Sequence, residues 1–181
     1  MIKKLLRSAI ELFSICALIL LDQYTKLWAV NTLKDQPAIP LIPHVLEFYY
    51  LPNGNTGAAF GILAGQKPLF LLIGTIVIFL MLYLLFQMPF ENRYRWLNIL
   101  IICIAAGGAG NMLDRIRLNY VIDFIYISAI DFPIFNVADC YVSVSTVLLA
   151  LLMLFYYKEA DLILLEKEMK KPFGKKKNKE V

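Results

Sequence analysis

Two aspartates, Asp123 and Asp139, are the residues whose type and position could most directly support chemistry, and each has apolar neighbours in the chain. Two carboxylates held close together in a low-dielectric site do not both ionise easily, so they tend to share one proton. One can then act as a base on a water molecule while the other acts as an acid, as in aspartic proteases. From spacing alone, the alternative is that each aspartate caps a helix or pairs with Arg115 or Arg117.

Other catalytic machinery is scarce in this sequence. The single histidine, His44, follows Pro43, and there is neither an H-E-x-x-H zinc motif nor a G-x-S-x-G nucleophile motif. The three cysteines lie in apolar stretches without metal-ligand spacing, and we interpret them as small buried hydrophobic residues: Cys16, Cys103 and Cys140. We therefore expect no metal and no cofactor, and carboxylates are the remaining candidates for hydrolysis.

A second polar group, Asp22 and Lys26, lies inside an apolar stretch. The two side chains are four residues apart, so they share one helix face and can neutralise each other when buried. This spacing favours a structural role. A substrate contact or a relay role remains the alternative.

A third polar group follows the small residues at 106–110. Ala106 and Gly110 have the small-x-x-x-small spacing that allows two helices to pack closely. Asn111 and Arg115 share a helix face, and the Arg115 guanidinium can donate two hydrogen bonds to a carbonyl or carboxylate. The sequence leaves two roles open for this group, substrate positioning or a clamp between Asp114 and Arg115 at the helix end.

The elements that must position these residues are predicted to be membrane helices. The chain is 60% hydrophobic and only 18% charged, with a mean hydropathy of +0.65, whereas a soluble domain is roughly 45–50% apolar and about 25% charged. Four stretches can cross a bilayer, which takes roughly 20 helical residues: residues 12–33, residues 68–90, the segment between Arg95 and Asp114, and the segment between Asp139 and Lys158. The first lacks an A-x-A-like cleavage site and is interpreted as a retained span.

The distribution of positive charge predicts the topology. With the N-terminus in the cytoplasm, the inside segments contain 13 Lys and Arg residues and the outside segments contain 4. Both termini are therefore expected inside, and the aspartate pair near the outer face. The net charge of +4 arises mostly in the tail, so it indicates topology and contact with membrane lipid rather than nucleic acid. We expect one domain over residues 1–165 and a basic cytoplasmic tail over 166–181.

The first outer segment, residues 34–67, has a different pattern. It contains four prolines, a β-favouring run at residues 45–51 and a turn-like stretch at 52–55, followed by small residues at 56–61. This pattern predicts two or three short strands at the membrane surface.

Five motifs along the chain, each weak alone, together resemble those of bacterial lipoprotein signal peptidase (signal peptidase II) in order and in placement. They are LDQYTK at residues 21–26, NTGAAF at 55–60, GNMLDR at 110–115, VIDF at 121–124 and FNVAD at 135–139. The resemblance implies an α-helical membrane protein with four transmembrane helices and a small extracytoplasmic β-sheet cradle. It also implies an inner-membrane aspartic endopeptidase that cleaves prolipoproteins before the diacylglyceryl-modified cysteine. A monomer is expected.

By this resemblance, Asp123 and Asp139 fall on the family's catalytic positions. Positions that line its substrate groove are matched by Asn55, Gly57, Asn111, Arg115 and Asn136, and positions that support the fold by Asp22 and Asp114, with Lys26 as the partner of Asp22. Gly61 and Cys140 stand where serine is frequent in the family, and we expect neither to disturb the pair. The alternative from another class is a proton-coupled transporter that uses its intramembrane aspartates as a relay.

Overall fold

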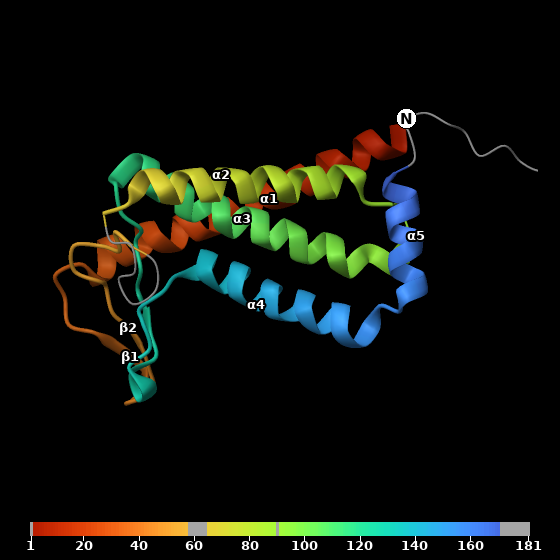
Figure 1. Ribbon diagram of the computed structural model, residues 1–181. Coiled ribbons are helices and arrows are strands. Elements are labelled where there is room, and N and C mark those ends of the chain that lie inside the picture. The colour runs from red at the N-terminus through yellow and green to blue at the C-terminus, as the bar shows by residue number, and fades with distance from the viewer. Residues whose placement is uncertain (1, 58–64, 90, 171–181) are drawn as a thin grey trace, which may run out of the picture.

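The computed structural model describes residues 2–57, 65–89 and 91–170, and most of them are helical (Figure 1). In chain order the helices and strands are α1 (Ile2–Leu33), β1 (Ile39–Ile42), β2 (Leu46–Phe48), α2 (Lys67–Gln87), α3 (Arg95–Leu118), β3 (Ile125–Tyr126), α4 (Val137–Leu151) and α5 (Glu159–Met169). Short 3₁₀ turns lie at Asn92–Tyr94 and Ser128–Ile130, and a π-helical turn, Leu152–Tyr156, continues α4.

Three helical stretches are long and apolar enough to cross a membrane, namely Lys67–Gln87, Asn92–Leu118 and Val137–Tyr156. They correspond to the second, third and fourth predicted spans. Large apolar side chains such as Phe79 and Val147 point outward from them and are exposed. A helix satisfies its own backbone hydrogen bonds, so it can lie in lipid when its outward side chains are apolar, as they are here.

The first predicted span, residues 12–33, lies within α1, which begins ten residues earlier at Ile2. Three charged side chains of α1 are buried in the bundle: Glu11, Asp22 and Lys26. Leu20, Leu27 and other apolar residues of α1 are exposed. Thus α1 turns these charged side chains toward the protein together with apolar residues such as Ile15 and Ala29, and its exposed side is apolar.

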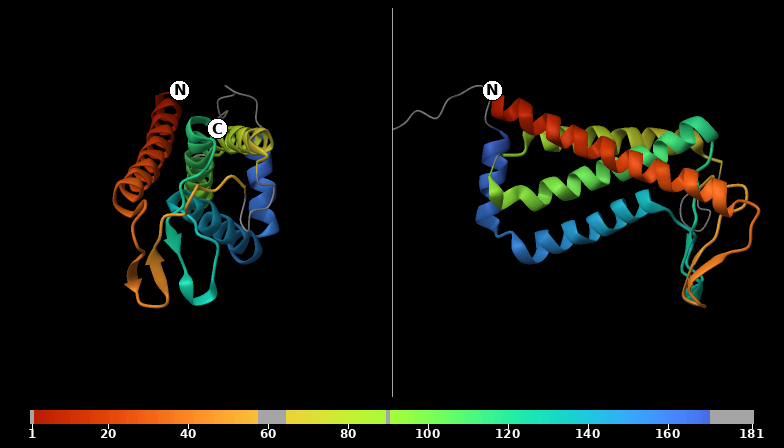
Figure 2. Two further views of the ribbon diagram at one scale, coloured as in Figure 1. Left: turned by 90° about the vertical axis from the view of Figure 1, so that its left-hand side faces the viewer. Right: turned by 180° about the vertical axis from the view of Figure 1, so that it is seen from behind.

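Helix α3 packs against α1, α2 and α4, and glycines make this contact close. A Cβ atom on Gly107 would lie 2.4 Å from the carbonyl oxygen of Ala138 on α4. A Cβ on Gly110 would lie 2.6 Å from Asp22 Oδ2 on α1. The close helix packing predicted for residues 106–110 is therefore confirmed (Figure 2).

A small antiparallel sheet with strand order β1-β2-β3 stands at one end of the helical bundle (Figures 1 and 2). Short strands were expected from residues 34–67, and β1 and β2 come from that segment. The third strand, β3, comes instead from the connection between α3 and α4 and pairs with β2. Residues 58–64, which include Gly61 and part of the small-residue stretch, lie outside the described residues.

Beside the sheet, residues 49–55 run antiparallel to residues 121–124. Tyr49 N donates to the carbonyl of Phe124, Leu51 N donates to the carbonyl of Asp123, and Asn55 and Val121 exchange two backbone hydrogen bonds of 2.9 Å each. These four backbone hydrogen bonds join the two outer segments next to Asp123.

At the opposite end of the bundle, α5 lies across the helix ends (Figure 1). Arg93 donates two hydrogen bonds to the Asp161 carboxylate, the Tyr94 hydroxyl donates to the Asp161 carbonyl, and the Tyr157 hydroxyl donates to the Arg93 carbonyl. We call these four residues the clasp. Helix α5 continues past residue 165 to Met169, into the segment expected to be a basic tail, and residues 171–181 lie outside the described residues.

Candidate active site

Asp123 lies in the extended segment between α3 and β3 and is 1% exposed. Its neighbours Ile122 and Phe124 pack into a hydrophobic cluster with residues of α1, and because successive side chains of an extended chain point to opposite sides, Asp123 points the other way. Asn55 Nδ2 donates to its Oδ2 at 2.9 Å, and Asn136 Nδ2 donates to its Oδ1 at 2.6 Å. The local alternation of apolar and polar residues thus places this carboxylate.

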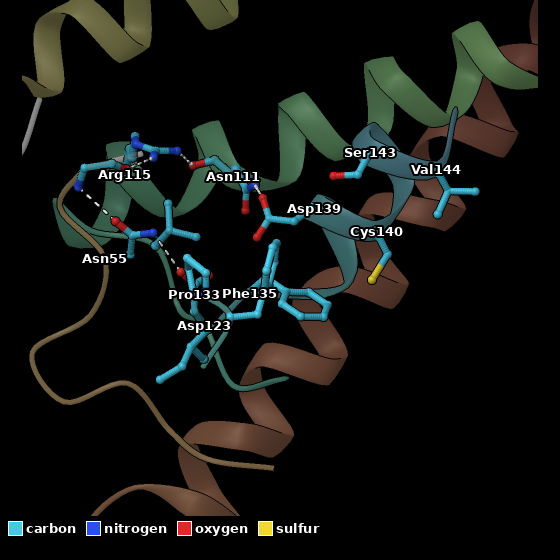
Figure 3. A pocket seen from close by; sticks show the side chains of 14 residues that line it. Asn55, Asn111, Arg115, Asp123, Pro133, Phe135, Asp139, Cys140, Ser143 and Val144 are labelled. Atoms are coloured by element: carbon cyan, nitrogen blue, oxygen red, sulfur yellow. Dashed lines mark hydrogen bonds between the residues drawn. The ribbon is translucent and has the colours of Figure 1, made fainter. Parts of the chain in front are cut away.

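Asp139 lies in the first turn of α4, where it forms a capping box with Asn136. Asp139 Oδ2 accepts a hydrogen bond from the Asn136 backbone N–H, and Asn136 Oδ1 accepts one from the Asp139 backbone N–H, each at 3.0 Å. Asp139 Oδ1 accepts a further bond of 2.7 Å from Asn111 Nδ2 on α3 (Figure 3). Helix capping, considered from the sequence as an alternative to catalysis, therefore occupies one oxygen of Asp139.

The two carboxylates belong to one hydrogen-bonded system, because Asn136 contacts both. Burial raises the pKa of Asp123 to about 7, and the nearby charge of Asp139 acts in the same direction. The N–H donors of Asn55 and Asn136 oppose this rise because they stabilise the ionised form. Near neutral pH this arrangement can hold a single proton between the two carboxylates, which suits paired acid and base chemistry.

A cavity of about 460 Å³ opens beside the two carboxylates (Figure 3). One side of it is polar and is lined by Asn55, Gly57, Asn111, Arg115, Asp123 and Asp139. The other side is formed by residues of the segment before α4 and by one face of α4, including Phe132, Pro133, Ile134, Phe135, Cys140, Ser143 and Val144. A site with a few polar groups on an otherwise apolar wall is suited to an apolar ligand that carries a polar reacting bond.

Arg115, at the end of α3, links the cavity to the outer segment. Its Nη2 donates to the Gly57 carbonyl at 2.8 Å, and its guanidinium lies 4.6 Å from the centre of the Phe70 ring on α2. Gly57 N in turn donates to Asn55 Oδ1 at 2.9 Å, which orients the Asn55 amide so that its Nδ2 faces Asp123.

Behind the cavity, Lys26, Asp22 and Asp114 form a buried ion cluster, which we call the lysine cluster. Lys26 Nζ lies 2.9 Å from Asp22 Oδ2 and 2.9 Å from Asp114 Oδ2, and none of the three side chains is more than 2% exposed. Asp22 Oδ1 also accepts from Ala138 N on α4, and Asp114 Oδ2 accepts from Ile122 N. The cluster therefore ties α1, α3, α4 and the Asp123 segment together.

The structure brings the residues singled out in the sequence together in two layers. Six of the predicted site residues line the cavity, as given above. Cys140 lines it too and, like Cys103, is only partly buried, while Cys16 is exposed, so the interpretation of the cysteines as buried residues is wrong. Asn136, expected to line the groove, is instead fully buried behind the carboxylates and is not among the lining residues. The Asp114 carboxylate bonds to Lys26, Gln23 and Ile122 N, whereas the Arg115 guanidinium donates to the Gly57 carbonyl. The clamp between Asp114 and Arg115, one of the two roles left open by the sequence, is therefore not formed by these bonds.

Several cavity residues were not singled out from the sequence, chiefly Phe132, Pro133, Ser143 and Val144. Their types carry no chemical signal, and only their position at the start of α4 and before it would have indicated them. Among the described residues, no group of three or more His, Cys, Asp or Glu side chains could hold a metal ion.

A helical membrane protein with two carboxylates in one buried hydrogen-bonded site has the features of the membrane aspartic peptidases. The sequence profile of the family described as signal peptidase (SPase) II matches residues 14–155. This match covers well over half of the chain, which therefore belongs to the signal peptidase II family.

Curated relatives agree with this assignment. Proteins named lipoprotein signal peptidase from Streptococcus pyogenes serotype M5 (strain Manfredo) and serotype M18 (strain MGAS8232) are each 38% identical over 156 residues, covering 86% of this chain and 98% of the relative.

Two solved structures described as bacterial membrane enzymes, determined by the in meso method at 2.3 and 1.9 Å resolution, superpose with TM-scores of 0.68. They are 28% and 29% identical to this chain, cover 83% and 82% of it, and are themselves covered over 93% and 95%. The similarity thus extends to the fold.

Proposed function

We infer that this chain is an aspartic endopeptidase that removes the signal peptide from prolipoproteins by cleaving before the diacylglyceryl-modified cysteine. Membership of the signal peptidase II family carries this conclusion. The buried pair of carboxylates beside a largely apolar cavity supports it, because hydrolysis of a lipid-anchored peptide needs both features. The family assignment favours the peptidase over the proton-coupled transporter considered from the sequence.

We propose that Asp123 and Asp139 are the catalytic residues. The raised pKa of Asp123, to about 7, supports a pair that shares one proton near neutral pH. We propose that Asp123 holds this proton at rest and that Asp139 is the base. Asp139 removes a proton from a water molecule as the water oxygen attacks the scissile carbonyl carbon. Asp123 then gives its proton to the leaving amide nitrogen as the C–N bond breaks. The products are the carboxyl end of the signal peptide and the free amino group of the lipidated cysteine.

The polar side of the cavity is proposed to bind the extended peptide. Arg115, Asn55 and Asn111 carry donors that can reach substrate carbonyl groups, and Gly57 offers backbone at the cavity edge. Asn136 is too deeply buried to touch the peptide, so its proposed role is to orient the two carboxylates. Asp22, Lys26 and Asp114 support this arrangement from behind. The apolar side would accept apolar parts of the substrate.

We also propose the topology in which α1 is a fourth span. Its apolar outer side and the length of 32 residues support this placement. Both termini then lie in the cytoplasm, and the sheet and the site lie near the outer face of the inner membrane. The peptidase is proposed to be a monomer in contact with membrane lipid, with one domain over residues 1–165 followed by a basic cytoplasmic tail over 166–181.

The proposal is tested by incubating the detergent-solubilised chain with a purified prolipoprotein, with and without its diacylglyceryl group. We expect cleavage of the lipidated form only. Asp123→Asn and Asp139→Asn should each lower kcat by about 100-fold to 10,000-fold or more, the range typical of lost acid–base catalysis. Asp131→Asn is the matched control, because Asp131 is an exposed aspartate in the same outer connection whose carboxylate accepts a hydrogen bond from the Tyr126 hydroxyl.

Each variant is compared with the unsubstituted chain for its thermal unfolding midpoint, so that loss of activity is not confused with loss of fold. Cleavage that survives either substitution in the pair would remove that residue from the mechanism. A well-folded chain that cleaves neither form of the substrate would overturn the proposed function.

A further inference from the structure

The lysine cluster makes a contact that an ion cluster alone does not explain. Besides its two carboxylate partners, Lys26 Nζ donates a hydrogen bond of 2.9 Å to Asn111 Oδ1. An ammonium group has three N–H donors and no acceptor. All three donors of this 1% exposed group are therefore assigned, two to Asp22 and Asp114 and one to an amide at the active site.

This contact determines which way the Asn111 amide points. Because an ammonium offers only donors, the atom of Asn111 that faces Lys26 has to be the oxygen. The nitrogen of the same planar amide then faces the opposite direction, where Nδ2 donates 2.7 Å to Asp139 Oδ1. One charged donor on α1 thus decides that Asp139 receives an N–H group from α3.

Asn136 supports the same orientation from the other side. Its Oδ1 accepts from the Asp139 backbone, so its Nδ2 is directed to Asp123 Oδ1 at 2.6 Å and to Asn111 Oδ1 at 3.0 Å. If the Asn111 amide turned over, its NH₂ group would face the Lys26 ammonium and the Asn136 NH₂, while its oxygen would face the Asp139 carboxylate. All three contacts would become repulsive, so Lys26 and Asn136 together hold one orientation.

We propose that Lys26 is a positioning residue for catalysis, which acts through the polarity of the Asn111 amide rather than only by joining helices. The proposal rests on the proposed function, since it concerns the hydrogen bond received by the catalytic Asp139. In the peptidase, Lys26 keeps an N–H donor on Asp139 Oδ1, and this donor holds the carboxylate in one rotamer while it accepts the proton from water. A purely structural role would affect the amount of folded protein but not the turnover of each folded molecule.

The decisive variant is the double substitution Lys26→Met/Asp114→Asn. The lysine cluster has a formal charge of −1 with two carboxylates and one ammonium, and the double variant keeps −1 with Asp22 alone. The net charge of the cluster is therefore matched while the donor to Asn111 is lost. The control is Asp114→Asn alone, which retains Lys26 and its bond to Asn111.

We expect kcat of the double variant, per folded molecule, to fall about 10-fold to 100-fold, the effect of losing one hydrogen bond to a charged group. KM should stay within about twofold because Lys26 does not line the cavity. The Asp114→Asn control should lose much less of kcat. An unchanged kcat in a double variant with a lowered unfolding midpoint would overturn the proposal, as would a raised KM with unchanged kcat.

A second variant decides the matter if the double variant does not fold. Asn111→Asp is nearly isosteric and still accepts from Lys26 and Asn136, but it replaces the N–H donor to Asp139 by a carboxylate oxygen and so adds a negative charge beside the pair. A folded Asn111→Asp protein with undiminished kcat would also overturn the proposal. These outcomes are distinct from failure of the proposed function, in which the unsubstituted chain itself would not cleave the lipidated substrate.

Discussion

The lysine cluster and the clasp stand at opposite ends of the bundle and hold ion pairs in different surroundings (Figure 1). The side chains of Lys26, Asp22 and Asp114 are at most 2% exposed. In the clasp, by contrast, Arg93 is 38% exposed and Asp161 is 19% exposed. Water can solvate the clasp if its ion pair is broken, but it cannot reach a charge left alone in the lysine cluster. Breaking an ion pair should therefore lower stability more in the lysine cluster than in the clasp.

The carboxylates near these two regions also shift their pKa in opposite directions. Hydrogen bonds from Arg93 and from the Lys158 backbone hold the pKa of Asp161 below its usual value. Burial instead raises the pKa of Asp123 to about 7. The clasp therefore stabilises the ionised form of Asp161, which supports the fold. The active site instead favours the protonated form of Asp123, which can exchange a proton near neutral pH.

The largest effect is expected from breaking the lysine cluster. Asp22→Ala leaves the buried Lys26 with one carboxylate fewer and removes the acceptor for Ala138 N, so we expect about 3–5 kcal/mol of destabilisation. Thermal unfolding in detergent measures this change. Glu159→Ala, which removes an exposed carboxylate from α5, is the control and should leave the midpoint nearly unchanged. A midpoint for Asp22→Ala as high as that of Asp161→Asn, which breaks the clasp ion pair, would show that the two ends do not differ as the burial suggests.

The opposite pKa shifts predict opposite dependences of stability on pH. The pKa of Asp123 is higher in the folded state than in the unfolded chain, so its contribution is fully present below about pH 4 and is lost as pH rises through about 7. The change is on the order of 4 kcal/mol at most. For Asp161 the pKa is lowered, so its contribution is present above the unfolded pKa and is lost as pH falls.

Unfolding midpoints between about pH 4 and pH 8 test the contribution of Asp123. Asp123→Asn should remove part of the decline in stability with rising pH, whereas Asp161→Asn should leave that decline in place. A decline that is identical in the unsubstituted chain and in Asp123→Asn would contradict the proposed proton on Asp123 near neutral pH.

The sequence predicted the features that depend on local spacing. The apolar stretches located α2, α3 and α4, because a bilayer demands a length that can be counted. The Asp22 and Lys26 pair followed from their four-residue spacing, and the close packing at Gly107 and Gly110 followed from small residues on one helix. The resemblance of five motifs then placed Asp123 and Asp139 together.

What the sequence could not predict depends on contacts between distant segments. Strand β3 exists because residues 125–126 meet β2, which is some 80 residues earlier in the chain. The burial of Asn136 and the direction of the Asn111 amide depend on where α1, α3 and α4 meet. Helix α5 also was not predicted, since its position depends on hydrogen bonds to Asp161 from Arg93 and Tyr94, which lie in a distant segment.

The smallest effect is expected from Asp161→Asn in the clasp. The substitution removes the charge pair with Arg93, but the amide oxygen can still accept from the Lys158 backbone N–H that begins α5. The bonds from the Tyr94 hydroxyl to the residue 161 carbonyl and from the Tyr157 hydroxyl to the Arg93 carbonyl use groups that the substitution does not touch. The unfolding midpoint should therefore change little, because a solvated ion pair contributes little to stability.

Turnover of the lipidated substrate by Asp161→Asn should equal that of the unsubstituted chain, since the clasp lies at the far end of α3 and α4 from the aspartate pair. Steady-state kinetics measure this directly, with Asp22→Ala run in parallel. A drop in kcat at a preserved unfolding midpoint would mean that the clasp controls how α3 presents Asn111 to Asp139. The two ends of the bundle would then be coupled. The difference in solvent exposure between the lysine cluster and the clasp would no longer show which of them positions the catalytic groups.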